Sequence, residues 1–522
     1  MMMTRLWILI CSAFFVGTVS SVGQAVHSDV MKLSTLAERI SQDNIREYLE
    51  VLSADDMEGR EAGHPGNIKA AEYLADKLAS FGYETPVRTT GYFQYFPLYN
   101  QRWENTTITI DKNEYDHLTD FYALPSQNPN LPSFHTEEIL YLGYGQTSED
   151  YNDFQEVDLA NRVVIIREGQ PSQLGGTTSP SELEGHKLQA ARNAGVRLIF
   201  VISNQYNSRL GRYRQILATP SVSTKVSQSK RTNVVYISPR MADQIMESQM
   251  DKIEAYDAEM YSAPGKQMSP VVIDAPTDIV LHKITEYVYV PNVVGYLPGK
   301  DPKLQHEVLV LSAHLDHVGK KGDDIYNGAD DDGSGTSTIL EIARVFSELA
   351  AEEKDFPRRS LLILFANGEE KGLLGSAYYA DNPLYPLSST ITNLNVDMIG
   401  RRDAAHSDNP YYVYIIGSDK LSSDLHHINE GINQSLTNLE LDYTYNDEAD
   451  PNRFYYRSDH YNFAKNDIPV IFYFTGVHED YHKPTDTIDK IEFSKMLTIG
   501  HLIFGTAWEL LTRDARPEVD KK

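Results

Sequence analysis

The stretch LSAHLDHVGKKGDDIYNGADDDGSG, residues 311–335, limits the folds open to this chain more than any other part of it. Four apolar residues, 308–311, lead into the stretch and predict a buried strand that ends close to His314. Apolar residues at helical spacing follow over 336–350 and predict a helix. The polar residues therefore lie between a strand end and a helix start, where open α/β sheets bind their ligands. We expect a metal site there.

Strands and helices continue to alternate over residues 291–511. Further buried strands are predicted at 361–365, 394–396 and 469–474. Glycine, threonine and histidine residues interrupt the last apolar segment, 496–511, which favours a buried helix over a membrane span. We therefore predict an α/β fold with a mixed, largely parallel sheet that helices cover on both faces.

The length of 522 residues predicts more than one domain, because single domains usually have about 100–200 residues. Residues 33–84 have a helical pattern, and Gly82 follows the predicted helix 69–80 as its stop. Over 137–273 the pattern changes to short strands and helices around a loop rich in glycine, serine and proline. We interpret this block as an inserted accessory domain with a small core of its own.

The N-terminus has the features of a signal peptide. Arg5 precedes an apolar run over 6–16, and small residues follow up to Ala25, which predicts cleavage after residues 1–25. The run is shorter than the roughly 20 residues that span a bilayer, so we favour export to the periplasm or the medium over a membrane anchor. The only cysteine, Cys11, lies in this segment, and the mature chain would need no disulfide.

The charge balance limits the classes of partner. The chain has 47 basic and 74 acidic residues, a net charge of -27, and no cluster of Lys and Arg that would follow a phosphate backbone. We therefore expect no nucleic acid partner, and no stable membrane insertion after signal cleavage. The pattern favours no particular oligomeric state.

Side chains of the types that bind metals follow the predicted strands. One such residue alone means little, because these residues also cap helices. Two imidazoles and three carboxylates, one of them bridging, would give each of two zinc ions three protein ligands and leave positions open for water or substrate. From five separate strand exits, the candidates are His314 with Asp316, the triplet 330–332, Glu369 with Glu370, Asp397, and His482.

Six motifs carry a resemblance to a known family: AHLD at 313–316, GADDDGSG at 328–335, GEEKGLLGS at 368–376, NVDM at 395–398, SDH at 458–460 and YHKPTD at 481–486. In their order and spacing the sequence resembles peptidase family M28, secreted and periplasmic zinc exopeptidases with co-catalytic metals and a phosphorylase/hydrolase-like fold. Residues 58–66 also resemble the family's N-terminal segment. The resemblance implies a peptidase domain from 26–136 and 274–522, with 137–273 as an inserted α/β protease-associated domain.

The resemblance assigns the metal ligands by position. It implies that His314 and Asp397 hold one zinc ion, that Glu370 and His482 hold the other, and that Asp331 bridges them. The family's bridging carboxylate lies two residues before the small residue of the acidic loop, which selects Asp331 over its two acidic neighbours. Those neighbours are then expected to shape the loop. Cobalt or manganese could replace the two zinc ions.

The resemblance also implies a catalytic role for Glu369, as the general base that takes a proton from the attacking water and passes it to the leaving amine. Asp316 is placed to orient His314 through the other imidazole nitrogen. Tyr481 would either donate a hydrogen bond to the tetrahedral intermediate or serve as a solvated structural tyrosine. We expect His460 to form part of the pocket and His317 not to bind metal.

These assignments predict an aminopeptidase that hydrolyses peptides with a free N-terminus. A carboxypeptidase or dipeptidase of the same family is the alternative, and Arg401 or Arg402 would then bind the substrate carboxylate. A single-zinc glutaminyl cyclase would not need all five ligands. A receptor that has lost its metals would show substituted ligands, whereas all five positions and Glu369 are intact here.

Overall fold

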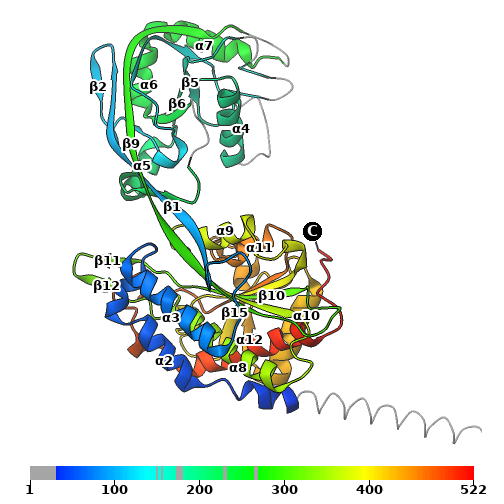
Figure 1. Cartoon of the computed structure of the whole chain (residues 1–522). Coiled ribbons are helices and arrows are strands. Elements are labelled where there is room, and N and C mark those ends of the chain that lie inside the picture. Colours follow the sequence, from blue (N-terminus) through cyan, green and yellow to red (C-terminus); the bar gives the residue numbers. More distant parts are fainter. Residues whose placement is uncertain are drawn as a thin grey trace, which may run out of the picture. The chain divides into compact units, whose positions relative to one another are not determined.

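The chain forms two compact units. Unit 1 comprises Met1–Phe96 and Tyr289–Lys522, and unit 2 comprises Pro97–Val288. The computed structural model describes residues 31–147, 151–154, 157–171, 180–226, 232–263 and 268–521 (Figure 1). The predicted signal peptide, with Cys11, lies outside the described residues.

Unit 1 is built on a mixed sheet in the order β16-β15-β17-β14-β10-β13-β9. The four central strands, β17, β14, β10 and β13, are parallel to one another, whereas β15 pairs antiparallel with β17 and β9 pairs antiparallel with β13. This confirms the predicted fold class. The strands are β9 (Val271–Leu297), β10 (Val308–His314), β13 (Ser360–Ala366), β14 (Thr390–Val396), β15 (Tyr412–Ile416), β16 (Glu440–Asp442) and β17 (Val470–Phe474).

Helices cover both faces of this sheet, which is why every residue of β10, β13 and β14 is buried. On one face, α2 (Gln42–Leu52), α3 (Pro65–Phe81), α8 (Gly333–Glu352), α10 (Ser423–Ile432) and α12 (Phe493–Thr512) share a single apolar cluster with the strands. On the other face, Tyr379 of α9 (Leu374–Asp381) and Phe463 of α11 (His460–Ala464) pack with Val310 and Leu362. Among the described helices, none combines the length and the apolar character needed to cross a bilayer.

The carboxyl ends of the central strands meet at one edge of the sheet. His314, the last residue of β10, is paired in register with Ala366 at the end of β13. Val396, the last residue of β14, is paired with Tyr473 near the end of β17. Side chains that follow these four strands are therefore brought to the same crevice, as open α/β sheets require.

In unit 2 the strand order continues from β9 through β4, β5, β6, β8 and β3. Helices α6 (Pro239–Met246) and α7 (Met250–Met260) contribute to one apolar cluster, and α4 (Pro180–Asn193) and α5 (Tyr206–Ala218) contribute to a second. The remaining strands are β1 (Phe93–Ile110), β2 (Asn113–Tyr115), β3 (Phe121–Tyr122), β4 (Phe134–Tyr141), β5 (Val163–Arg167), β6 (Leu198–Ile202), β7 (Ser221–Ser223) and β8 (Asn233–Ile237), with the separate hairpin β11 (Gly319–Lys321) and β12 (Asp324–Tyr326) in unit 1.

Unit 2 is longer than the block 137–273 that the change of pattern predicts. The additional residues belong largely to β1 and β9, two long strands that each begin in one unit and end in the other. Both strands pair with each other, and they carry the chain into and out of unit 2.

Candidate metal centre

The five predicted ligands converge at the sheet edge where the central strands end. The Nε2 atom of His482 lies 3.1 Å from Asp331 Oδ2 and 3.1 Å from Glu370 Oε2. The Nε2 atom of His314 lies 3.3 Å from Asp331 Oδ1 and 3.6 Å from Asp397 Oδ1. Asp331 thus has one oxygen toward each histidine, the arrangement that a bridging carboxylate needs.

Four of these side chains follow strands of the central sheet, but Asp331 does not. It lies in the loop between the β11–β12 hairpin and α8, so the prediction of five strand exits holds for only four ligands. The start of α8 positions this loop. Asp332 is the N-cap residue of α8, and its side chain accepts a hydrogen bond from the Gly335 amide.

The two acidic neighbours of Asp331, Asp330 and Asp332, accept hydrogen bonds from backbone amides. The Asp332 carboxylate also accepts from the amides of His314 and Met398, and Asp330 accepts from the Gly400 amide. Asp332 lies close enough to His314 and Asp397 to join their ligand group. Since its oxygens already hold three backbone donors, we regard Asp331 as the more available ligand on that side.

Carboxylates and imidazoles are crowded together here, and most of them are buried, although the His482 side chain is 38% exposed. Burial alone lowers the pKa of His314, but the carboxylates of Asp397 and Glu369 outweigh it and raise that pKa well above its usual value. Burial raises the pKa of Asp331, yet the three neighbouring histidines hold it well below the ordinary range. A bound cation would offset the repulsion among the carboxylates directly.

Unsatisfied buried atoms test whether the residues fit a metal. Among the described residues, the Oε1 atom of Glu370 and both ring nitrogens of His317 are buried without a hydrogen-bond partner. Such atoms cost free energy unless something binds them. Imidazole nitrogens and carboxylate oxygens are the donors that zinc takes in proteins, so the set fits the predicted ion.

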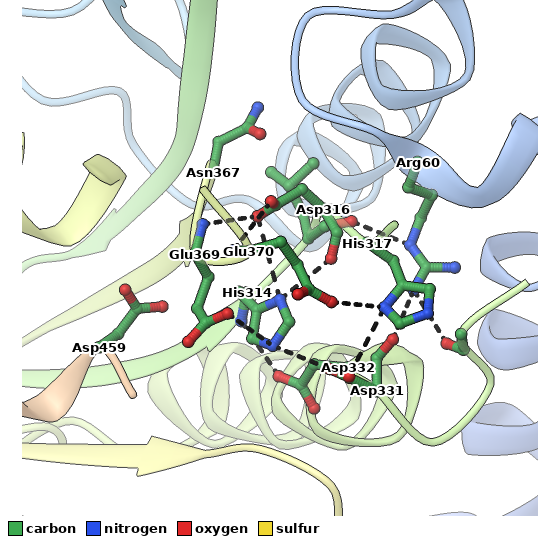
Figure 2. A network of polar contacts seen from close by, with 12 residues as sticks. Arg60, His314, Asp316, His317, Asp331, Asp332, Asn367, Glu369, Glu370 and Asp459 are labelled. Carbon is green, nitrogen blue, oxygen red and sulfur yellow. Dashed lines mark hydrogen bonds and ion pairs between the residues drawn. The ribbon is translucent and has the colours of Figure 1, made fainter. Parts of the chain in front are cut away.

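Glu369 lies beside the ligands without belonging to either ligand group. Its Oε2 atom is 4.0 Å from His314 Nε2, and its side chain lines the adjacent pocket. Burial raises the pKa of this carboxyl well above its usual value, and the nearby charges of Asp397 and Glu370 add to the effect. Figure 2 shows it next to His314.

Asp316 contacts His314 through its backbone carbonyl, and not through its carboxylate as the sequence predicts. The His314 Nδ1 atom lies 3.0 Å from the backbone carbonyl of Asp316 and 3.9 Å from its carboxylate. The carboxylate instead accepts hydrogen bonds from the amides of Glu369 (3.0 Å) and Glu370 (3.4 Å). Asp316 therefore orients the imidazole with its main chain and the glutamate pair with its side chain.

His317 is the residue at this site that sequence reasoning set aside. It is fully buried, and its Nδ1 atom lies 2.8 Å from Glu370 Oε1 and 3.7 Å from Asp331 Oδ2. Its ring meets that of His482 edge-on, with 5.6 Å between centroids. The signal that could have found it is its position three residues after His314, just beyond the end of β10.

An apolar pocket adjoins the ligands. Tyr481 lines it and stacks on the His482 ring at 3.9 Å, and burial raises the pKa of the Tyr481 phenol, which therefore stays protonated. Beside the carboxylates and His482, the pocket is lined by Met398, Phe454, Arg457, Phe472, Phe474 and Val477.

His460 and Ser458 of the SDH motif act behind the pocket rather than in it. The His460 ring stacks on Phe472 at 4.7 Å, and burial lowers its pKa to about 3, so it is neutral. Ser458 donates a 2.7 Å hydrogen bond to Asp397 Oδ2. The motif therefore supports one wall of the pocket and one ligand.

The two arginines that a carboxypeptidase would use are engaged elsewhere. Arg401 pairs with Asp480 at 3.0 Å, and Arg402 pairs with Glu492 at 2.8 Å. Neither lines the pocket beside the ligands, where the arginine is Arg457.

A buried arginine from the N-terminal segment fixes the loops that carry the ligands. Arg60, at the end of the 3₁₀ turn Asp55–Arg60, is 1% exposed. It donates hydrogen bonds only to main-chain carbonyls, and burial lowers its pKa. The acceptors are the carbonyls of Leu52, Leu315, Asn327, Gly328 and Asp331.

Comparisons with known proteins agree with this geometry. Residues 292–507 match the model of peptidase family M28. A probable leucine aminopeptidase of Arthroderma otae is 31% identical over 231 residues, which cover 42% of this chain and 57% of the relative. A probable zinc metalloprotease of Pyrenophora teres f. teres is 25% identical over 307 residues, 50% of this chain and 60% of the relative. The chain thus spans little more than half the length of these two relatives.

A solved structure resembles the whole chain. The aminopeptidase from Aneurinibacillus sp. strain AM-1 superposes with a TM-score of 0.54 at 19% identity, and the match covers 94% of this chain and 98% of that one. At this identity the likeness establishes the fold.

Proposed function

We propose that this chain, whose residues 292–507 match the model of peptidase family M28, is a two-zinc aminopeptidase that removes the first residue of peptides. The proposal is carried by the position of the Asp331 side chain. It directs one carboxylate oxygen to His314 and the other to His482, at the mouth of an apolar pocket. A shared carboxylate between two imidazoles is the requirement of a paired metal site.

In this proposal His314, Asp331 and Asp397 hold one zinc ion, and Asp331, Glu370 and His482 hold the other. When bound, the two ions polarise the scissile carbonyl and lower the pKa of a water molecule. The protein's part is to fix the ligands. Ser458 donates a hydrogen bond to Asp397, and His314 Nδ1 donates one to the Asp316 carbonyl, and both contacts hold a ligand in place.

Glu369 is the proposed general base. Its carboxylate faces the pocket and is left out of both ligand groups, so it is available to accept a proton from water and deliver it to the leaving amine. The protonated phenol of Tyr481, on the same pocket wall, would donate a hydrogen bond to the developing oxyanion.

The charge around the pocket favours a free N-terminus. Of the carboxylates that line it, Glu369 lies outside both ligand groups, so its negative charge is left to attract an α-ammonium group once the metals are bound. The aromatic and aliphatic wall fits an apolar first side chain. Arg457 is the group that would bind a substrate carboxylate, and it keeps a carboxypeptidase as the competing function.

The proposed function is tested with paired peptides blocked at either end. The purified protein is incubated with each peptide, with and without a chelator, and the products are identified by mass spectrometry. We expect chelator-sensitive release of the first residue, abolished by N-terminal acetylation and unaffected by C-terminal amidation. Loss of the last residue instead would establish a carboxypeptidase, and an absence of cleavage by zinc-loaded protein would favour a receptor-like role.

The bridging role of Asp331 predicts the loss of both metals from a single substitution. Asp331→Ala should lower the bound zinc from two ions per chain to less than one, because each site loses one of its ligands. Zinc is measured by inductively coupled plasma mass spectrometry after desalting. Asp408→Ala, which removes an exposed carboxylate, is the control and should keep both ions. Full zinc content in Asp331→Ala would show that the two sites share no ligand.

A further inference from the structure

His317 is held in place by main chain from two distant parts of unit 1. Its amide donates a 3.2 Å hydrogen bond to the carbonyl of Arg60, and its ring is fully buried. Gly328 of the acidic loop lies against the ring, since a Cβ atom there would be only 2.5 Å from His317 Cδ2. The ring position is therefore set by packing and is not free to adjust.

In that position the ring directs one nitrogen to the ligands of a single site. Nδ1 approaches Glu370 Oε1 (2.8 Å) and Asp331 Oδ2 (3.7 Å), the same two carboxylates that His482 contacts. Ligand atoms of His317, Asp331, Glu370 and His482 all lie within 4.8 Å of one another. Figure 2 shows His317 facing Glu370 and Asp331.

The contact between His317 and Glu370 is close without being a satisfied hydrogen bond. Nδ1 and Oε1 are 2.8 Å apart, yet both remain without a partner of acceptable hydrogen-bond direction among the described residues. Both atoms are lone-pair donors, and their residues belong with Asp331 and His482 to a group whose ligand atoms lie within 4.8 Å of one another, close enough to share one cation. A cation shared in this way would satisfy both atoms and remove the cost of leaving them buried.

We propose that His317 is a fourth protein ligand of the zinc ion held by Asp331, Glu370 and His482. This inference rests on the proposed two-zinc function and adds to it. Two imidazoles and two carboxylates complete a tetrahedral zinc site from protein alone.

The consequence is that the two sites are not equivalent. The site with His317 is closed, as in zinc sites that stabilise structure, whereas the site of His314, Asp331 and Asp397 keeps an open position. Glu369 lies on the side of the open site, 4.0 Å from His314 Nε2. The site with four protein ligands would hold its ion and the bridging carboxylate in place and could contact the scissile carbonyl only by adding a fifth ligand, whereas the open site would receive water directly.

A competing role for His317 is a hydrogen bond to Glu370 that only orients it. The two roles differ in the distance between zinc and Nδ1. A zinc-soaked crystal of the full chain, with anomalous diffraction measured at the zinc edge, tests this without any substitution. We expect Nδ1 at about 2.0–2.1 Å from the ion between Glu370 and His482.

Zinc bound by the other three residues, with Nδ1 at hydrogen-bond distance from Glu370, would overturn the role of His317 and leave the proposed aminopeptidase intact. An absence of zinc density at both sites at saturating zinc would overturn both proposals.

Stepwise zinc affinity, measured by competition with a chromophoric chelator, gives a second readout that does not depend on activity. Two equivalents of unequal affinity are expected in the unsubstituted protein. His317→Gln should weaken the tighter equivalent by more than about 100-fold, beyond the roughly 10- to 100-fold typical of residues that only orient a ligand. A smaller loss would contradict direct ligation.

His501→Gln is the matched control, because His501 is a partly buried imidazole of α12 whose Nε2 atom also lacks a hydrogen-bond partner among the described residues, and it lies outside both ligand groups. It should leave both zinc affinities unchanged. Circular dichroism of both variants confirms that each is folded, and an equal loss of zinc in the two would overturn the specific role of His317.

Discussion

Glu369→Gln should keep both zinc ions and lose about 10²- to 10⁴-fold in kcat, the contribution typical of a general base. The amide has the same shape as the carboxylate but cannot accept the proton. The main-chain hydrogen bond from residue 369 to Asp316 does not involve the substituted group, so the local fold should persist. The measurement combines kcat on leucine p-nitroanilide with the zinc content of the same sample.

Glu370→Gln is the matched control for this prediction. It makes the same chemical change one residue away, on a side chain that contacts His482 at 3.1 Å and belongs to a ligand group. This variant should lose zinc together with activity. Unchanged turnover in Glu369→Gln would mean that another group accepts the proton, and loss of zinc from it would make Glu369 a ligand.

Arg60→Lys should give the largest loss of stability. The five carbonyls that accept from the guanidinium cannot all be reached by a single ammonium group, which has three donors and no planar fork. At least two buried carbonyls lose their donor, at about 1–3 kcal/mol each, so the free energy of unfolding should fall by about 2–6 kcal/mol. Urea unfolding of the metal-free protein, followed by circular dichroism, measures it.

Arg39→Lys serves as the control for charge and size. Arg39 makes a surface ion pair with Glu352 at 2.8 Å, and such pairs contribute about 0–1 kcal/mol. Its replacement should leave the unfolding midpoint nearly unchanged. If Arg60→Lys unfolded like this control, water or other donors would have to satisfy the carbonyls of the ligand loops.

The predicted ligands lie close together because of a simple property of parallel sheets. Strands in register end at one edge, so His314, Glu370, Asp397 and His482 could be expected together once their strands were identified. Apolar runs identify such strands reliably when both faces are buried. The two glutamates of the GEE motif, by contrast, were told apart only by resemblance to a family.

The direction of His317 could not be derived in the same way. Periodicity shows where β10 ends, but it does not show how the chain turns afterwards. That turn is fixed by the Arg60 carbonyl and by Gly328, neither of which is a neighbour of His317 in sequence. For the same reason, the sequence could not predict the main-chain contact between Asp316 and His314.

The limits of unit 2 could not be predicted from the sequence, because the two connecting strands cross them. β1 has 18 residues and β9 has 27, and each strand continues across the boundary between the units. Only the contacts divide them between the units. The identity of this unit as a protease-associated domain stays a prediction.

The carbonyls that bind Arg60 also determine the order in which a growing chain can fold. Arg60 is separated by 255 residues from Leu315 and by 271 from Asp331, and the whole of unit 2 is synthesised in between. Domains generally fold as units during synthesis. Unit 2, a contiguous segment, can therefore bury its core while the N-terminal helices, which leave the ribosome first, still lack the strands of unit 1 that they pack against. A nascent chain has to keep the Arg60 guanidinium in water until residue 331 has emerged.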